Sequence, residues 1–268
     1  MKKICIITLC WNHLKEATAP FIESLYKFTD EKDFDLIVVN NNSTDGTKEF
    51  LEEVSKSHKN MEVVNMPKNL GYAGGNNVGL NIFFNRNKPK KKYDFVGLLN
   101  NDILFTPNWL PNTLKAFSYD DAIGMASPRS NEHCRLTPKN YLSGYKKFLK
   151  RFKGDIKYTL APFFSCVLIK REVVEKIGLL DEAFNPAFFE DYDYAFRAQY
   201  AGYSMAYVND AFIFHNHSTT SRSTKSEISE RNKKYFFKKH PLGKWVWEHK
   251  KSSILKDIIR IFKEHKNK

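Results

Sequence analysis

The chain has 268 residues, of which 42% are hydrophobic and 15% aromatic, and its formal net charge is +13. This length fits one catalytic-sized domain with an appendage, and the composition excludes a chain that is disordered throughout. Residues 231–268 hold 13 Lys and Arg against 3 Asp and Glu, so +10 of the +13 lies there and only +3 in the first 230 residues. A main body so weakly charged argues against a nucleic-acid enzyme, which needs a basic groove.

The cysteines and the N-terminus bear on the compartment. Cys5, Cys10, Cys134 and Cys166 form no C-x-x-C pair and no metal-site spacing, which predicts free thiols in a reducing cytoplasm. The first 19 residues follow the basic, apolar and small-residue order of a signal peptide, but charged residues at 15 and 16 interrupt it, so we predict no cleaved signal. No apolar run reaches the roughly 18 residues of a membrane-spanning helix.

Short apolar runs alternate with helix-like stretches through the first half of the chain. The expected strands are 4–9, 35–40, 61–66 and 93–100, and the expected helices are 14–28, 44–57 and 73–86. Such alternation, at steps of about 30 residues, is typical of βαβ units. It predicts an α/β fold with a doubly wound, mostly parallel sheet and helices on both faces.

The second half of the chain predicts fewer elements. We expect a strand within 161–170, a following helix that ends at Gly178, and a helix at 190–201. Thr106 and Pro107 have the pattern of a helix cap followed by proline at the first helical position. Phe188 and Phe189 either belong to the core or offer aromatic faces to a ligand.

Polar residues follow four predicted strands, at the sheet edge where ligands bind in open α/β folds. They lie at 10–12, 40–47, 69–77 and 100–102 and are rich in asparagine. The side chain of asparagine carries a donor and an acceptor in one rigid amide, which suits the edge of a nucleobase or sugar hydroxyls. Each cluster taken singly favours turn formation. Together, at successive strand ends, they indicate a binding site.

Acidic and imidazole side chains are candidates for chemistry. Asp102 could hold a divalent cation whose other ligands come from substrate and water, or it could cap a helix. Glu190 and Asp191 head a predicted helix, where an acid either complements the helix dipole or acts as a general base. His215 and His217 would share one face of a strand and include a metal ligand, or form a surface pair. The glycines at 69–77 match neither a dinucleotide-binding nor an ATP phosphate-binding motif.

The ordered motifs together resemble glycosyltransferase family 2, and one of them looks like rhamnosyltransferase-type members. They are LCWN, VNNNSTDGT, NLGYAGGNNVGL, NND and FFEDYDYAFRAQYAGY, and the resemblance runs from about Ile4 to His240. It implies a GT-A fold and inverting transfer from a nucleotide-diphosphate sugar. We expect a transferase domain over 1–220, with its donor half at about 1–105 and its acceptor half at about 106–220. A basic amphipathic helical extension would follow over 221–268.

The resemblance also implies roles for single residues. Asp191 would be the catalytic base and Glu190 would orient the acceptor or the base. Asp102 and His215 would hold Mn²⁺ or Mg²⁺. The implied donor-binding residues are Cys10, Trp11, Asn12, Asn40, Asn42, Asp45, Gly71, Gly75, Asn76, Asn100 and Asn101. At positions 10, 40 and 100 the sequence departs from the family pattern, which has threonine, aspartate and aspartate there.

The expected function is transfer of a hexose or deoxyhexose from a UDP- or dTDP-sugar to a hydroxyl of a bacterial-type surface glycan or its lipid-linked precursor. Two alternatives remain: a sugar nucleotidyltransferase, whose Gly-x-Gly-Thr-Arg segment the chain lacks, and a degenerate transferase that only binds glycans. The expected partners are thus a nucleotide sugar and a glycan acceptor, with no nucleic acid.

The basic tail allows two interpretations. Its apolar stripe consists of Trp245, Trp247, Ile254, Leu255, Ile258, Ile259 and Phe262, flanked by lysines. A helix of this kind either lies on an anionic membrane or packs on the domain with a solvated basic face. We therefore expect a cytoplasmic protein, with contact to the inner face of the membrane as the alternative that suits a lipid-linked acceptor.

Overall fold

The computed structural model describes residues 4–86, 92–131, 135–152, 155–162, 164–216 and 222–249. Its first half is a parallel sheet of four strands, β1 (Ile4–Cys10), β2 (Phe34–Asn40), β3 (Met61–Asn65) and β4 (Phe95–Asn100), in the order β3-β2-β1-β4. β1 and β2 are buried along nearly their whole length. Strands covered on both faces need apolar side chains at every position, which explains their continuous hydrophobic runs.

The helices between these strands lie where the sequence predicts them. A π-helical turn, η1 (Leu14–Thr18), leads into α1 (Ala19–Phe28), and a 3-10 turn, η2 (Glu31–Asp33), precedes β2. α2 (Thr47–Ser57) and α3 (Gly71–Arg86) complete the two further crossovers. The βαβ pattern predicted from hydrophobic periodicity is thus confirmed.

The second half of the sheet mixes strand directions. The order continues from β4 through β8 (Cys166–Lys170), β6 (Ile123–Arg129) and β9 (Ser204–His215) to β5 (Ile103–Phe105), and β7 (Ile156–Thr159) also pairs with β9. β8 runs antiparallel to both β4 and β6, whereas β6 and β9 are parallel. The predicted parallel arrangement therefore holds for β3, β2, β1 and β4, and the rest of the sheet mixes strand directions.

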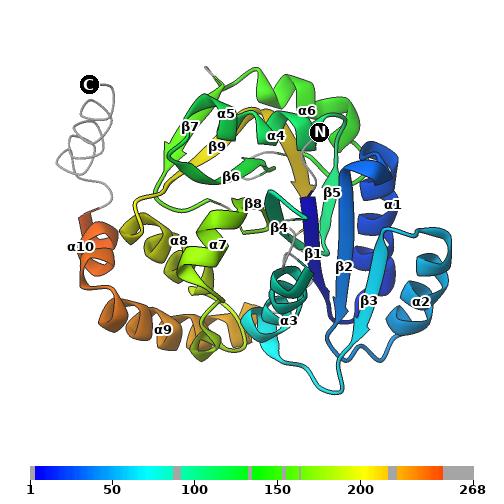
Figure 1. Ribbon diagram of the computed structural model, residues 1–268, viewed down its shortest axis with the longest axis horizontal. Helices are drawn as coiled ribbons and strands as arrows, with labels where there is room; N and C mark the ends of the chain where they lie inside the picture. The colour runs from blue at the N-terminus through cyan, green and yellow to red at the C-terminus, as the bar shows by residue number, and fades with distance from the viewer. Residues whose placement is uncertain are drawn as a thin grey trace.

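Two apolar layers cover the sheet, one on each face (Figure 1). One layer contains side chains of α1, α2, α4 (Trp109–Leu114) and α5 (Ala116–Tyr119). The other contains α3, α7 (Arg171–Ile177) and α8 (Glu190–Tyr200). α6 (Tyr141–Leu149) packs its aromatic residues against β9, and η3 (Glu182–Phe184) precedes α8.

One predicted helix start is wrong. α4 begins at Trp109 with Asn108 as its N-cap, in the left-handed region at φ 62°. Thr106 is buried instead, and its hydroxyl donates to the carbonyl of Phe212 at 2.6 Å. A contact to a strand more than 100 residues away has thus replaced the local capping role.

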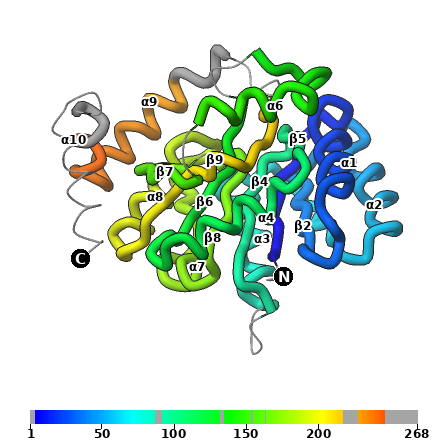
Figure 2. The backbone as a smooth tube through the Cα atoms, turned by 90° about the horizontal axis from the view of Figure 1, so that it is seen from above, coloured from blue at the N-terminus to red at the C-terminus, as the bar shows by residue number. Residues whose placement is uncertain are grey.

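The C-terminal helices α9 (Arg222–Lys239) and α10 (Pro241–His249) lie on the side of the molecule away from α1 and α2 (Figure 2). Phe236 of α9 is fully buried among Phe184, Phe189 and Phe196, so this part of the extension packs into the domain. Trp245 is 37% exposed. The stripe from Ile254 onward lies outside the described residues, as does His217. Among the described helices, none combines the length and the apolar character that crossing a membrane requires.

Candidate active site

Hydrogen bonds connect the loop that follows β1 to the loop that follows β2. The amide of Asn12 donates to the Ser43 hydroxyl at 2.9 Å, and the Asn12 Oδ1 atom accepts from the Thr44 amide at 2.8 Å. Asp45 accepts from the amides of Leu14 and Thr47 and from the Thr47 hydroxyl. These hydrogen bonds lower the pKa of Asp45, although burial opposes them. The strand ends thus form one connected rim.

The amide cluster after β2 is largely engaged within the protein. Asn40 donates to the Asn65 Oδ1 atom at 2.8 Å and accepts from the Ser43 amide, so it couples β2 to β3. Asn41, which the sequence did not single out, donates to Asn69 and accepts from the amide of Leu70. Asn42 is exposed and has φ 65°, which suits a turn. In this cluster asparagine builds the shape of the loop.

The first predicted motif divides into a buried and an exposed part. Cys10 has no exposed surface, belongs to the core, and burial raises the pKa of its thiol to about 12. Trp11, the next residue, is 53% exposed beyond the carboxyl end of β1. A ligand there would meet the indole of Trp11 and not the sulfur of Cys10. Of the other cysteines, Cys5 and Cys166 are also buried, and Cys134 lies outside the described residues.

The glycine-rich loop brings α3 against the segment that precedes α8. Gly71 has φ +73°, and a Cβ atom on it would lie 2.8 Å from the Asn185 Oδ1 atom and 2.9 Å from the Pro186 carbonyl oxygen. The next residue, Tyr72, donates its amide to that carbonyl at 2.7 Å. Gly75 faces β1, where a Cβ atom would overlap the side chain of Leu9. These glycines permit two close backbone approaches.

We expect Gly71→Ala to lower the free energy of unfolding by about 2–3 kcal/mol, because it adds a left-handed alanine and a contact with the Pro186 backbone. The matched control is Gly202→Ala, since Gly202 has φ +93° but nothing within 4 Å of the added carbon. It should lose only the conformational part, about 1 kcal/mol. Urea unfolding measures both. Equal losses would show that the loop adjusts freely around Pro186.

Two asparagines at the site have buried oxygen atoms without a hydrogen bond. The Oδ1 atoms of Asn76 and Asn100 have no partner among the described residues. Asn76 uses only its NH₂ group, which donates to the Tyr72 carbonyl at 2.9 Å. A buried acceptor without a partner costs about 1–3 kcal/mol, and such exceptions require an explanation such as a ligand or an ion. Asn101, by contrast, donates to the Thr18 hydroxyl at 2.9 Å.

Asp102 and His215 meet although they are more than 100 residues apart in sequence. Antiparallel pairing of β5 with β9 sets Ile103 opposite His215. The His215 Nε2 atom lies 3.1 Å from the Asp102 Oδ1 atom, and both side chains are largely buried. The backbone of His215 is fixed by Asn131, whose side chain both donates to it and accepts from it.

This pair fits a divalent cation. Two neighbouring ligands of an octahedral ion, each about 2.1 Å from the ion, are about 3 Å apart, which matches the distance between the Asp102 and His215 atoms. No group of three or more His, Cys, Asp or Glu side chains suited to a metal occurs within the described ranges. The protein would therefore supply two ligands, and substrate oxygens and water the rest. An oxygen–nitrogen pair suits Mn²⁺ as well as Mg²⁺.

Glu190 and Asp191 open α8 after two strained residues. Phe188 and Phe189 have φ 79° and 72°, a left-handed conformation that is uncommon for bulky side chains. Burial and the charge of Asp191 raise the pKa of Glu190 well above its usual value. Burial also raises the pKa of Asp191, to about 6, against hydrogen bonds from backbone amides such as that of Tyr192. The Oε2 atom of Glu190 has no hydrogen-bond partner among the described residues. Carboxyls of raised pKa suit proton transfer near neutral pH.

Tyr72 is buried close enough to three carboxylates for their charges to affect its pKa. Its hydroxyl donates to the Phe164 carbonyl at 3.3 Å. Burial raises the pKa of Tyr72 well above its usual value, and the charges of Glu190, Asp191 and Asp102 raise it further. The tyrosine therefore lies in the combined field of the candidate metal ligand and the candidate base. Sequence reasoning missed Tyr72, although it stands inside the glycine-rich motif.

A pocket of about 310 Å³ opens beside the candidate base. It is lined by consecutive residues of the α8 start and by α9, namely Phe188, Phe189, Glu190, Asp191, Tyr192, Ser229, Glu230 and Lys233. The charges of Glu230 and Lys233 pair with each other at 3.2 Å. The pocket thus combines aromatic faces, a hydroxyl and a balanced ion pair.

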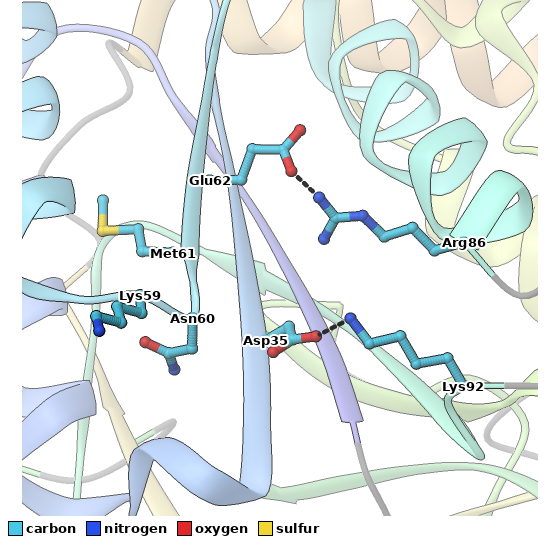
Figure 3. A pocket seen from close by; sticks show the side chains of 7 residues that line it. All are labelled: Asp35, Lys59, Asn60, Met61, Glu62, Arg86 and Lys92. Atoms are coloured by element: carbon cyan, nitrogen blue, oxygen red, sulfur yellow. Dashed lines mark ion pairs between the residues drawn. The ribbon is translucent and has the colours of Figure 1, made fainter.

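Another pocket, of about 380 Å³, lies at the opposite edge of the sheet, where β2 and β3 begin. Figure 3 shows two ion pairs among its side chains, Arg86 with Glu62 and Lys92 with Asp35, and Lys59 beside them without a drawn pair. Ligands of open α/β sheets bind at the carboxyl ends of strands. The position of this pocket therefore leaves the carboxyl edge as the candidate active site.

The family model of glycosyl transferase family 2 matches residues 5–178, well over half of the chain. The chain belongs to glycosyl transferase family 2. This result confirms the family and the enzyme class that the motifs predict. The matched range includes β1 to β8, and with them the strand ends and Asp102.

Curated relatives of this family 2 chain include two bacterial proteins. It is 27% identical over 197 residues to the O-antigen chain rhamnosyltransferase WbaN of Salmonella anatum. This match covers 70% of this chain and 58% of WbaN. It is 25% identical over 250 residues to the uncharacterized protein y4gI of Sinorhizobium fredii, which covers 85% of this chain and 26% of that protein. The chain therefore spans about a quarter to three fifths of these relatives.

Solved structures confirm the predicted GT-A fold. GalNAc-T7 with UDP, GalNAc and Mn²⁺ superposes with a TM-score of 0.62 at 14% identity, over 90% of this chain and 51% of that one. The mannosyltransferase PcManGT of Pyrobaculum calidifontis, in complex with GDP-Man and Mn²⁺, gives 0.59 at 17% identity, over 81% of this chain and 58% of that one. At such identities the likeness extends to the fold alone.

Proposed function

We propose that this protein is an inverting glycosyltransferase. It moves a sugar from a UDP- or dTDP-linked donor to a hydroxyl of a bacterial-type surface glycan or its lipid-linked precursor. The observation that carries the proposal is the pair of Asp102 and His215, whose side-chain atoms lie 3.1 Å apart close to the carboxyl end of β4. This pair is a candidate cation site for a diphosphate, and the buried carboxylates at the start of α8 include a candidate base for an acceptor.

The donor would lie along the rim at the carboxyl ends of β1, β2 and β4. The exposed indole of Trp11 offers a face for the nucleobase, and the loop built by Asn12, Asn40 and Asp45 frames the ribose. Asn76 and Asn100 have buried amide oxygens that a sugar or ribose hydroxyl could satisfy. A divalent cation on Asp102 and His215 would neutralise charge that develops on the departing diphosphate.

The reaction is one in-line displacement at the anomeric carbon. Asp191 accepts the proton of the acceptor hydroxyl, whose oxygen forms the new bond to that carbon. The bond between the anomeric carbon and the diphosphate oxygen breaks, and its electron pair leaves with the nucleotide diphosphate. Because the acceptor attacks opposite the leaving group, the anomeric configuration inverts. The neighbouring Glu190, whose pKa burial and the charge of Asp191 raise well above its usual value, orients the acceptor.

The acceptor would approach through the pocket of about 310 Å³ between α8 and α9. The partly buried ring of Phe188 suits a sugar face, and Ser229 suits its hydroxyls, whereas the ring of Phe189 belongs to the core. The resemblance to WbaN supports a surface glycan as the product. A lipid-linked acceptor would place the protein at the inner face of the membrane, where the charge of residues 231–268 favours anionic lipids.

The proposal is tested with a panel of UDP-, dTDP- and GDP-sugars. One pyrimidine donor at a hundredfold excess over its Kd should raise the Tm by about 5–10 °C with Mn²⁺, and less when EDTA replaces the metal. The same donor should release nucleotide diphosphate slowly in water and faster with acceptor. If no sugar nucleotide shifts the Tm, the donor site is wrong. A shift with GDP-mannose alone would overturn the pyrimidine assignment.

A further inference from the structure

The geometry points to Asn232 of α9 as a positioning residue that shapes the loop carrying the candidate catalytic carboxylates. This inference rests on the proposed function, because it concerns how Glu190 and Asp191 are presented. Asn232 is 1% exposed and belongs to the C-terminal helix, more than 40 residues after the loop.

One amide group holds three points of the loop. The Asn232 Nδ2 atom donates to the carbonyls of Phe184 at 2.8 Å, Ala187 at 2.8 Å and Phe188 at 3.0 Å. An amide carries two hydrogens, so at least one of them is shared between two carbonyls. Three carbonyls converge on one nitrogen only if the chain turns sharply around it. The turn ends two residues before Glu190.

Arg231 orients the amide. Its Nε and Nη2 atoms lie 3.1 Å and 3.0 Å from the Asn232 Oδ1 atom, and its Nη2 atom also donates to the Asn185 carbonyl. The oxygen end of the amide is thereby fixed, and the nitrogen end faces the loop. Two adjacent residues of α9 thus engage four carbonyls between residues 184 and 188.

The segment that Asn232 contacts includes the residues with strained backbone. Left-handed backbone at Phe188 and Phe189 costs about 1–2 kcal/mol each and persists only where the surroundings determine it. Asn232 bonds the carbonyl of Phe188, and Phe236, one helical turn on, packs its ring 5.7 Å from that of Phe189. On the other side, the Pro186 carbonyl accepts from Tyr72 in the donor loop. The loop therefore lies between the donor side and α9.

The inference is that α9 sets the distance between Asp191 and the donor. A misplacement of about 1 Å at the reacting groups can lower the rate about a hundredfold. Loss of the Asn232 NH₂ group should therefore reduce turnover without changing the affinity for the nucleotide sugar. The residues predicted to bind the nucleotide sugar and the metal lie on other elements.

The test compares Asn232→Asp with wild type. Aspartate keeps the shape of the side chain and its contact with Arg231 but removes the N–H groups. We expect kcat to fall about 10- to 100-fold and the KM of the acceptor to rise. The Kd of the nucleotide diphosphate with Mn²⁺ should stay within about twofold. A purely structural role would not raise the KM of the acceptor while leaving the Kd of the nucleotide diphosphate unchanged. A shift of the acid limb of the pH–kcat profile would not by itself support the role, because the added carboxylate can raise the pKa of Asp191.

Two controls separate the outcomes. Lys234→Ala, an exposed position on the same helix, should behave as wild type. If Asn232→Asp does not fold, Arg231→Ala takes its place, because it removes the orienting contacts and the bond to the Asn185 carbonyl but keeps the Asn232 amide, and kcat should fall about 3- to 10-fold. A folded variant with wild-type kcat and pH profile would overturn the role of Asn232 while wild-type turnover still supports the transferase. If wild type turns over no sugar nucleotide, the proposed function has failed and the inference fails with it.

Discussion

Replacing Asp191 by asparagine should lower kcat about 10²- to 10⁴-fold and leave the Kd of the donor within about twofold. The amide keeps the size of the carboxylate but cannot take the proton of an acceptor hydroxyl. The donor contacts proposed here lie at the ends of β1, β2 and β4 and remain intact. Release of nucleotide diphosphate with acceptor measures kcat, and calorimetry with the donor and Mn²⁺ measures Kd.

The matched control for this change is Asp94→Asn. Asp94 is exposed at the amino end of β4, across the sheet from the site, so the same chemical change should leave kcat unaltered. An Asp191→Asn variant with more than about a tenth of wild-type activity would rule out Asp191 as the base. A variant that also loses donor binding would indicate a donor-site role for this aspartate.

The raised pKa of Asp191 gives the same residue a pH signature. Asp191 accepts a proton only when ionised, so kcat should fall as the pH drops through about 6. Its folded pKa exceeds the unfolded value of about 3.9, so its contribution to stability is fully present below pH 4 and is lost as the pH rises through 6. At pH 7 the buried charge therefore costs stability. Asp191→Asn should raise the Tm by about 2–4 °C while it lowers kcat as stated above.

Replacing Asp102 by alanine should remove the effect of the metal. Without its carboxylate, His215 is the remaining side chain of the pair, and one neutral ligand holds Mn²⁺ weakly. We expect the Mn²⁺-dependent part of the donor thermal shift to disappear and kcat to fall about 10²- to 10³-fold. Titration calorimetry with Mn²⁺ and the nucleotide diphosphate measures the binding directly.

Asp102→Asn separates charge from shape at the same position. Asparagine keeps an oxygen near His215 but lacks the negative charge, so Mn²⁺ affinity should fall between the alanine variant and wild type. His215→Ala should also weaken metal binding, because it removes the nitrogen 3.1 Å from the carboxylate. Mn²⁺ and donor binding unchanged in both Asp102 variants would exclude a cation at this position. Departure of the nucleotide diphosphate would then depend on another group.

Much of the first half of the sheet could be predicted because it follows local rules. β1, β2 and β4 are covered on both faces, so their apolar runs mark their ends to within one or two residues. Parallel strands then bring their carboxyl ends to one edge, so the polar clusters after β1, β2 and β4 had to meet. The roles of Asp102, His215 and Asp191 entered through the family motifs, and these roles stay predictions until the variants are measured.

The sequence by itself therefore determined the βαβ order and the family, and it predicted the edge of the sheet at which a ligand would bind. Only the tertiary structure decided which polar groups remain available there. The amide of Asn40 is used by Asn65, Thr106 bonds Phe212 instead of capping α4, and Asn232 reaches back to the loop before Glu190. The charges of Asp102, Glu190 and Asp191 affect the pKa of Tyr72 for the same reason. Each hydrogen bond or field depends on residues between 25 and 119 positions apart, and such distances are fixed by packing, which no local pattern encodes.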